Sequence, residues 1–427
     1  MQLARILALK NDMVDVIYVS PFIISEDILR YYMKVLEVRN ANSMSRLTII
    51  TPEIKANIPS HLSLTKALLI SSQAIAKIKS CIKGSIAYIV PGIMSIDEVK
   101  LSCILGVPIL GGDPKTSQLY SSKSGSRRIF NSADIPIPTG QYDIYDENEF
   151  EMTLTKLVIS QPQISTWIFK IDDEFEGRGN ASLTVSSIKI IKRIKLKEIE
   201  LNEELVKIVY TKLHKLLSKK VVIAMPTLYK SWKEYIAAYC KHGGIIEAMP
   251  AESHEVNSPS VSFLIEPDGN IIIQGTYDRF NGRELINAGC LFPQTSLIDI
   301  NHQALCSAVG KPLYDKGIFG YVTVDLISFN YRPQESNNPL FWGIGISCFL
   351  SNYTTYMHFF DFLLNGTLNL ITGHYELMKE VPQERRFMCI NHLNYEGLSL
   401  LPYKAFFHMC RVEVCDQCRV SHMNLMI

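Results

Sequence analysis

The chain has 427 residues, of which 47% are apolar and 20% are charged, which is the balance of a globular protein with a buried core. This length accommodates about two or three domains. With 43 basic and 42 acidic residues the formal net charge is +1, so the overall charge predicts no nucleic-acid partner and no anionic membrane surface. The start of the chain lacks a secretory signal pattern and the ten cysteines form no dense framework, so a reduced, cytoplasmic setting is expected.

The first 120 residues are predicted to form a small α/β domain with a parallel sheet. Apolar segments that end in turn residues alternate with helical stretches, as in VDVIYVSP, RLTIITPE, SIAYIVPG and VPILGGDP. None of these strands is followed by a G-x-G-x-x-G fingerprint, and Gly310-Lys311 is followed by Pro312 instead of completing a P-loop. The two commonest nucleotide-binding motifs are therefore excluded.

The next segment, residues 121–244, combines helices with one clear strand. SGSRRIFNSA predicts a short helix, IPIPTG a turn and TWIFK a strand, and the apolar residues from Leu205 to Leu217 recur at helical spacing. The basic stretch SIKIIKRIKLK alternates charged residues with Ile and Leu, and we interpret it as the solvent-facing edge of a strand.

Strands dominate the prediction for residues 245–380. GIIEAMPA and GYVTVDLISF are typical strands, and VSFLIEPDGNIIIQGTYD predicts a hairpin that turns at Asp268-Gly269. Residues 339–360 contain no Asp, Glu, Lys or Arg and are long enough to cross a membrane. Their Ser, Asn, Thr and His residues instead favour a buried strand followed by a buried helix, so no membrane partner is expected.

The loop FKIDDEFEGRGNAS, residues 169–182, has two interpretations on its own residues. A calcium loop is excluded, because placing Asp172 at position 1 puts Leu183 where a bidentate Glu is required. A phosphate-binding loop rests on two flexible glycines and two cations, Gly177, Gly179, Lys170 and Arg178. Four carboxylates would repel a triphosphate and favour an acidic surface turn: Asp172, Asp173, Glu174 and Glu176.

The order and spacing of these segments resemble the ATP-grasp fold. The resemblance follows SSKSGSRRIFNSADIPIPTG, WIFK with the glycine loop, GIIEAMPAE, SPSVSFLIEPDG and GYVTVDL, and covers about residues 14–410. It is similar in particular to the C-terminal region of the IQ motif-containing protein H family, in the peptide-ligase-like branch. The resemblance implies a parallel-sheet pre-ATP-grasp domain (1–120), then a two-lobed α+β ATP-grasp-like domain: an N-lobe with a glycine lid (121–244) and a C-lobe (245–380). A divergent or truncated tail (381–427) follows.

The resemblance also assigns an ATP site. It places Lys123 and Lys170 at the phosphates, and the glycine lid, with the charge of Arg178, over them. Glu247 and the backbone near Met249 match the hinge that holds adenine and ribose. The implied ATP-binding residues are Lys123, Lys170, Gly177, Arg178, Gly179, Asn180, Glu247 and Met249.

The implied magnesium site is incomplete. Asp325 matches the first metal-binding acid, whereas WGIGISCF places Gly345, Ser347 and Phe349 where the family pattern has Glu, Asn and Arg. Glycine has no side chain to ligate and serine is a weak, neutral ligand, while phosphoryl transfer depends on charge neutralisation by the metal. We therefore expect ATP binding, with a regulatory or interaction role, rather than catalysis.

The sequence allows two alternative functions. The chain could be an active ATP-dependent carboxylate–amine ligase in which Asp278 replaces the missing ligand, or a scaffold whose cleft is blocked between Lys170 and Glu247. The resemblance connects the family with sperm development and leaves protein partners open. The calmodulin-binding IQ motif is absent from these 427 residues, so calmodulin is not a predicted partner.

Overall fold

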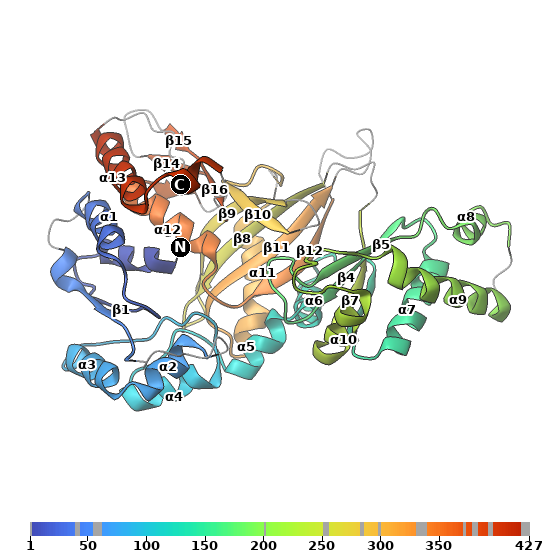
Figure 1. Cartoon of the computed structure of the whole chain (residues 1–427), viewed down its shortest axis with the longest axis horizontal. Coiled ribbons are helices and arrows are strands. Elements are labelled where there is room, and N and C mark those ends of the chain that lie inside the picture. Colours follow the sequence, from blue (N-terminus) through green and yellow to red (C-terminus); the bar gives the residue numbers. More distant parts are fainter. Residues whose placement is uncertain are drawn as a thin grey trace.

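The structure is a computed structural model, and it describes the chain except for residues 1, 39–42, 54–61, 200–201, 251–255, 282–285, 298–299, 330–339, 370–372, 378–382, 392–395 and 420–427. Helices and several sheets alternate along the chain, which confirms the predicted α/β class. In Figure 1 an N-terminal part, a central six-stranded sheet and a five-stranded sheet follow one another along the long axis.

The N-terminal part contains a parallel strand pair covered by helices. Its elements are η1 (Gln2–Lys10), β1 (Val16–Val19), α1 (Glu26–Glu37), η2 (Ser43–Arg46), β2 (Leu47–Ile50), α2 (Leu64–Ile70), α3 (Ser72–Ile82) and α4 (Ile96–Leu105). β1 and β2 pair in parallel, as predicted for the first two apolar segments. The third and fourth segments meet in one parallel bridge, between Ile89 and Ile109, so the sheet is smaller than expected.

Two helices connect this part to the sheets. They are α5 (Pro114–Ser121) and α6 (Lys123–Ser132), and α6 is the short helix predicted from its sequence. The hydroxyl of Ser122 accepts a hydrogen bond from the Gly125 N–H and caps α6 at its N-terminus. Ile129 and Phe130 of α6 are fully buried in the core of the six-stranded sheet. This packing fixes Lys123, the first residue of α6, at the edge of that core.

The five-stranded sheet has the order β3-β7-β4-β5-β6 and is antiparallel throughout. Its elements are β3 (Gly140–Ile144), α7 (Glu147–Ser160), β4 (Thr166–Ile171), β5 (Asn180–Thr184), α8 (Lys189–Lys195), α9 (Glu203–Lys220), β6 (Val222–Ile223), α10 (Trp232–His242) and β7 (Gly244–Ala248). β7 lies just beyond the expected boundary at residue 244 and belongs to this sheet.

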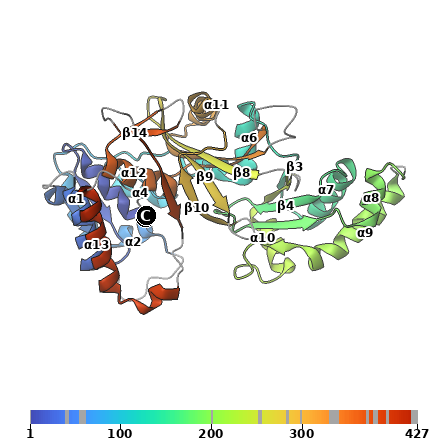
Figure 2. The ribbon, with the colours of Figure 1, turned by 90° about the horizontal axis from the view of Figure 1, so that it is seen from above.

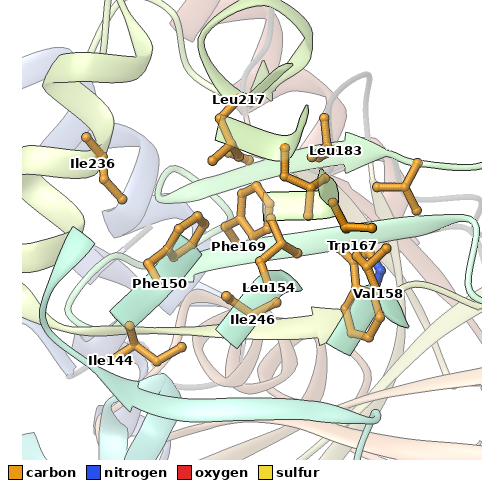
Figure 3. Packing of buried hydrophobic residues seen from close by; sticks show 14 of the residues in the cluster. Ile144, Phe150, Leu154, Val158, Trp167, Phe169, Leu183, Leu217, Ile236 and Ile246 are labelled. Atoms are coloured by element: carbon orange, nitrogen blue, oxygen red, sulfur yellow. The ribbon is translucent and has the colours of Figure 1, made fainter. Parts of the chain in front are cut away.

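The two faces of β4 have different environments. Trp167 and Phe169 point toward the helices and pack with Phe150 of α7 in the core that Figure 3 shows. Because side chains alternate along a strand, Ile168 and Lys170 point to the opposite face, where both line a cavity. The same strand therefore anchors the lobe and presents a lysine to the site.

The prediction for the basic stretch SIKIIKRIKLK was wrong, because it forms helix α8 instead of a strand edge. Ile188, Ile191 and Ile194 recur every three residues and are buried against the core of the lobe. This spacing suits one face of a helix, and the lysines and Arg193 project from the other side. The alternation of charged and apolar residues was too irregular to distinguish the two periods.

The six-stranded sheet has the order β12-β11-β8-β9-β10-β16. Its elements are β8 (Val256–Ile265), β9 (Ile271–Asn281), β10 (Asn287–Phe292), α11 (His302–Asp315), β11 (Gly320–Phe329), β12 (Leu340–Ser347), α12 (Asn352–Leu364) and β16 (Phe387–Ile390). The predicted hairpin is confirmed: β8 and β9 pair around Asp268-Gly269, and Gly269 adopts a positive φ of 90°.

The predicted tail contributes to this sheet. β16, at residues 387–390, pairs with β10, and α13 (Tyr403–Arg419) lies along α1, with the rings of Phe407 and Tyr31 6.3 Å apart. Figure 2 shows α13 beside α1. The smaller elements in this region are β13 (Thr367–Leu368), β14 (Tyr375–Leu377), β15 (Gln383–Arg385) and η4 (Glu396–Leu400).

Within the uncharged stretch, residues 340–347 form β12 and residues 352–360 lie in α12, as the sequence predicted. Phe359, Phe360 and Phe362 of α12 are buried among apolar side chains of the protein. Within the described residues, none of the helices combines the length and the apolar character that crossing a membrane requires.

The α9 helix offers a test of the N-lobe core. Leu213 is 1% exposed within this core, whereas Ile208 on the same helix is 47% exposed. Leu213→Ala is expected to lower the free energy of unfolding by about 2–5 kcal/mol, because it removes buried methyl groups and leaves a cavity. Ile208→Ala is the control and should change it by much less. Urea denaturation followed by tryptophan fluorescence measures both, and equal effects would contradict this core.

Candidate nucleotide site

A cavity of about 1850 Å³ lies at the junction of the N-terminal part and the two sheets. Of the nine residues that the sequence assigned to ATP or metal, seven line it: Lys123, Lys170, Gly177, Arg178, Asn180, Glu247 and Asp325. They come from α6, β4, the loop 172–179, β5, β7 and β11, so the fold gathers side chains from more than 200 residues of sequence. The predicted residues therefore share one site, although what the site binds is a separate question.

A buried ion triad forms the floor of the site. Glu247 on β7 is 2% exposed, and its two carboxylate oxygens contact Lys170 on β4 and Arg127 on α6, which is 3% exposed. Burial alone would raise the pKa of Glu247, but Lys170 and Arg127 outweigh it and hold this pKa below its ordinary value. The carboxylate of Glu247 is thus ionised, and its two ion pairs join β4 and β7 to α6.

Lys123, the first residue of α6, is a further cation that lines the cavity. Burial and the positive charge of Lys170 lower the pKa of its amine, while Asp325 opposes this shift and Arg279 adds to it. Among the residues that the structure describes, none forms an ion pair with Lys123. This ammonium group can therefore pair with a ligand anion without breaking a contact in the protein.

Three of the four carboxylates that argued against phosphate binding point away from the cavity. Asp172 accepts a hydrogen bond of 2.7 Å from the Ser124 N–H near the start of α6, and Asp173 lies 3.4 Å from the imidazole of His242. Glu174 pairs with Arg178 and accepts a hydrogen bond from Tyr229. Only Glu176 lines the cavity. The loop therefore repels an anion much less than its composition suggests.

The loop 172–179 contacts the six-stranded sheet at two points. The ring of Phe175 meets the ring of Phe349, which follows β12, at 5.4 Å and nearly perpendicular. The Asn287 N–H donates a hydrogen bond of 3.3 Å to the Glu176 carbonyl oxygen. Glu176 and Gly177 both adopt positive φ, which turns the backbone back toward β5. The loop therefore covers the cavity as a lid, and an aromatic contact holds it at the position where the sequence lacks the expected Arg.

Two predicted residues do not line the cavity. A side chain at Gly179 would collide with Glu174, and its carbonyl oxygen accepts a hydrogen bond from the buried Tyr235 hydroxyl, so this glycine is required by packing. The Met249 N–H donates to the Thr166 carbonyl oxygen at 3.0 Å. Both residues therefore lie outside the cavity lining and are held by backbone hydrogen bonds of the N-lobe.

The surroundings of Asp325 do not fit a magnesium site. Its Oδ2 lies 3.1 Å from Nη1 of Arg279, and its Oδ1 accepts a hydrogen bond of 2.7 Å from Ser260. Gly345 stands directly opposite it on β12 and offers no ligand. Across the described parts of the chain, no cluster of three His, Cys, Asp or Glu side chains could hold a metal ion. The described residues around Asp325 therefore do not offer magnesium a complete set of ligands.

Asp278 does not replace the missing ligand. Its Oδ2 accepts hydrogen bonds from the N–H and the hydroxyl of Thr295, and its Oδ1 accepts one from Ser296. It precedes Arg279 on β9, and alternation along the strand directs it to the other face, outside the cavity lining. The blocked-scaffold alternative also lacks its predicted feature, because Lys170 and Glu247 contact each other directly and both border the cavity.

Two functional candidates escaped the sequence reasoning. Arg127 lies inside SGSRRIFNSA and Arg279 follows Asp278 in GTYDRF, but neither belongs to a recognisable motif. A signal was present for Arg127, since it falls four residues after Lys123 and thus on the same helical face. The position of Arg279 depends on the pairing of β9, β8 and β11, which local sequence does not reveal.

The triad predicts a pH-dependent loss of stability. Glu247→Gln leaves two buried cations without their carboxylate, so the free energy of unfolding at neutral pH should fall by about 3–5 kcal/mol. Because the folded pKa of Glu247 lies below 4.5, this contribution is present above that pH and is lost as the pH falls further. The difference in free energy of unfolding between wild type and Glu247→Gln, measured by urea denaturation, should therefore become smaller in acid.

The control for this variant is Asp315→Asn, which removes one carboxylate at an exposed position at the end of α11. It should leave the free energy of unfolding nearly unchanged at both pH values. A Glu247→Gln variant as stable as Asp315→Asn would show that the triad contributes nothing to the fold.

The aromatic contact of the lid predicts a local change in dynamics. Phe349→Ala removes the ring that meets Phe175, so amide hydrogen exchange in residues 175–178 should become faster while the rest of the lobe is unaffected. Leu291→Ala, at an exposed position on β10, is the matched control. Unchanged exchange in the lid would mean that the Glu176–Asn287 hydrogen bond alone holds it.

The family described as IQCH-like, ATP-grasp matches residues 114–371, which is more than half of the chain. The chain is 31% identical to IQ motif-containing protein H of Danio rerio over 96% of its own length, and it spans 41% of that protein. It thus corresponds to less than half of this curated relative.

One solved structure supports the fold. A complex of biotin carboxylase from Campylobacter jejuni with β,γ-ATP has a TM-score of 0.50 and 15% identity, covering 84% of this chain and 68% of that one. The biotin carboxylase domain of 2-oxoglutarate carboxylase from Hydrogenobacter thermophilus gives 0.47 and 14%, with 83% and 66% covered. At 15% identity, the similarity to the Campylobacter jejuni structure supports the fold alone. With the match over residues 114–371 and the 31% identity, the chain belongs to the IQCH-like ATP-grasp family.

Proposed function

We propose that this chain is a nucleotide-binding ATP-grasp module that has lost ligase activity and serves a regulatory or interaction role. The observation that carries the proposal is the gathering of Lys123 and Lys170 in one cavity beneath the glycine lid. Two lysines and the backbone amides of a glycine turn suit the charge of a polyphosphate. The biotin carboxylase of similar fold was solved with an ATP analogue, which supports the same ligand class here.

The proposed arrangement assigns a part of the nucleotide to each group. The phosphates lie between Lys123 and Lys170, and Gly177 and Arg178 of the lid close over them. The base lies toward β7, where Glu247 is fixed by its two cations and Met249 follows the end of the strand. Asn180, at the start of β5, borders the cavity beside the lid.

The loss of catalysis follows from the surroundings of Asp325. Ligation through an acyl phosphate needs metal ions that neutralise the transferred phosphoryl group. Here one carboxylate is paired with Arg279 and the facing position is Gly345. We extend the proposal to a cytoplasmic role in sperm development, which rests on the family resemblance alone, with protein partners left open.

The binding proposal predicts a specific loss. Lys123→Met keeps the length of the side chain but removes an ammonium group that forms no ion pair with the described residues, so the fold should be preserved. We expect ATP affinity to fall by about tenfold or more, the effect of losing one charge-assisted contact. Isothermal titration calorimetry measures the dissociation constant, and thermal unfolding without ligand checks the fold.

Lys115→Met on the neighbouring helix α5 is the control, since this lysine is exposed and outside the cavity lining. It should bind ATP like wild type. The proposal fails if wild-type protein has no ATP affinity better than about 1 mM, or if both lysine variants bind equally. Sustained ADP release with a carboxylate and an amine would favour the ligase alternative.

A further inference from the structure

Both oxygens of Asp325 are already engaged by the protein. Oδ1 accepts the Ser260 hydroxyl at 2.7 Å, and Oδ2 lies 3.1 Å from Nη1 of Arg279. A divalent ion that bound Asp325 through Oδ2 would have to displace the guanidinium group of Arg279, whose side chain is only 11% exposed. The carboxylate therefore faces a protein cation where a metal ion is expected.

The sheet fixes Arg279 in that position. Ser260 on β8 stands opposite Asp325 on β11, and Ser258 on the same face of β8 stands opposite Arg279 on β9. The arginine thus reaches across β8 to the carboxylate, and its Nη2 also donates to the Leu326 carbonyl oxygen at 3.3 Å. Its Nε–H is buried and has no hydrogen-bond partner in the described part of the chain. The guanidinium is anchored by the protein but not fully satisfied by it.

Space for a second acidic side chain exists, although the sequence does not fill it. An ideal Cβ at Gly345 would lie 3.8 Å from Oδ2 of Asp325 and 3.9 Å from Nζ of Lys123, which are ordinary contact distances. The backbone there would therefore accept a Cβ without displacement. Absence of the second carboxylate is a property of the sequence and does not result from crowding.

We propose that the cavity binds the polyphosphate of a nucleotide without a divalent metal ion, with the guanidinium of Arg279 in the place of that ion. This inference rests on the nucleotide binding proposed above. Arg279, Lys123 and Lys170 all border the same cavity, and Asp325 and Glu247 balance only part of their charge. Metal-free ATP carries more negative charge than magnesium-bound ATP, so these fixed cations attract it more strongly. A planar guanidinium can also donate to phosphate oxygens while it stays paired with Asp325.

The first experiment compares metal conditions on the wild-type chain. ATP dissociation constants are measured by calorimetry in EDTA and in excess magnesium. We expect the affinity in EDTA to equal or exceed the affinity in magnesium. Binding only in magnesium would overturn this inference while leaving the proposed nucleotide binding intact. No binding in either condition would overturn both.

The second experiment removes the replacement cation. In EDTA, Arg279→Gln should weaken ATP binding by about tenfold to a hundredfold, because a charge-assisted contact is lost and Asp325 becomes an unpaired anion beside the phosphates. Arg279→Lys keeps the charge and should recover part of the affinity. Thermal unfolding without ligand confirms that both variants are folded. Equal ATP binding by Arg279→Gln and wild type would overturn the role of Arg279.

The third experiment reverses the metal dependence. The double variant Arg279→Gln with Gly345→Glu exchanges the guanidinium for a second carboxylate opposite Asp325. Two carboxylates suit magnesium and repel free phosphates, so ATP should now bind more tightly in magnesium than in EDTA. Titration with magnesium alone gives a second readout. A double variant that still prefers metal-free ATP would contradict the placement of Arg279 at the metal position.

Discussion

Glu247 is held between Lys170 and Arg127, and much of the molecule is positioned through this contact. Lys170 and Glu247 lie on neighbouring strands of the five-stranded sheet, whereas Arg127 lies on α6, which packs into the core of the other sheet. The two lobes therefore meet at one buried carboxylate. A carboxylate with this little exposure is tolerated only when cations surround it, so none of the three residues can be changed alone without cost.

Helix α6 also contacts β12 of the six-stranded sheet. The Ser126 hydroxyl accepts a hydrogen bond from the Ile346 N–H, and the ring of Phe130 lies where a side chain at Gly343 would be. The absence of a side chain at Gly343 thus allows β12 to pack directly against α6. The same helix begins with Lys123. This short helix therefore orients the ammonium group of Lys123, the arginine of the triad and β12, the strand that faces Asp325.

Sequence alone predicted the elements with strong local signals. The hairpin at Asp268-Gly269, the helix of Lys123 and the strand of Lys170 depend on turn chemistry and periodicity, and all three are present. The glycine loop could be located but not interpreted, because the partners of its carboxylates lie elsewhere in the chain. Arg127 and Arg279 act through contacts across strands and lobes, and such contacts leave no periodic trace. The helix of Ile191 was missed because its short apolar period also fits a strand.

The strand at residues 387–390 has a consequence for how this protein can be shortened. It covers the edge of β10, and its Phe387 stacks on Phe292 at 5.0 Å. The family match ends at residue 371, before this strand begins. A protein cut at that limit would expose an unpaired strand edge with buried aromatic residues beside it, and such edges promote association between molecules. The fold thus extends beyond the region by which the family is recognised, and β16, which follows residue 371, covers the edge of β10 and the aromatic residues beside it.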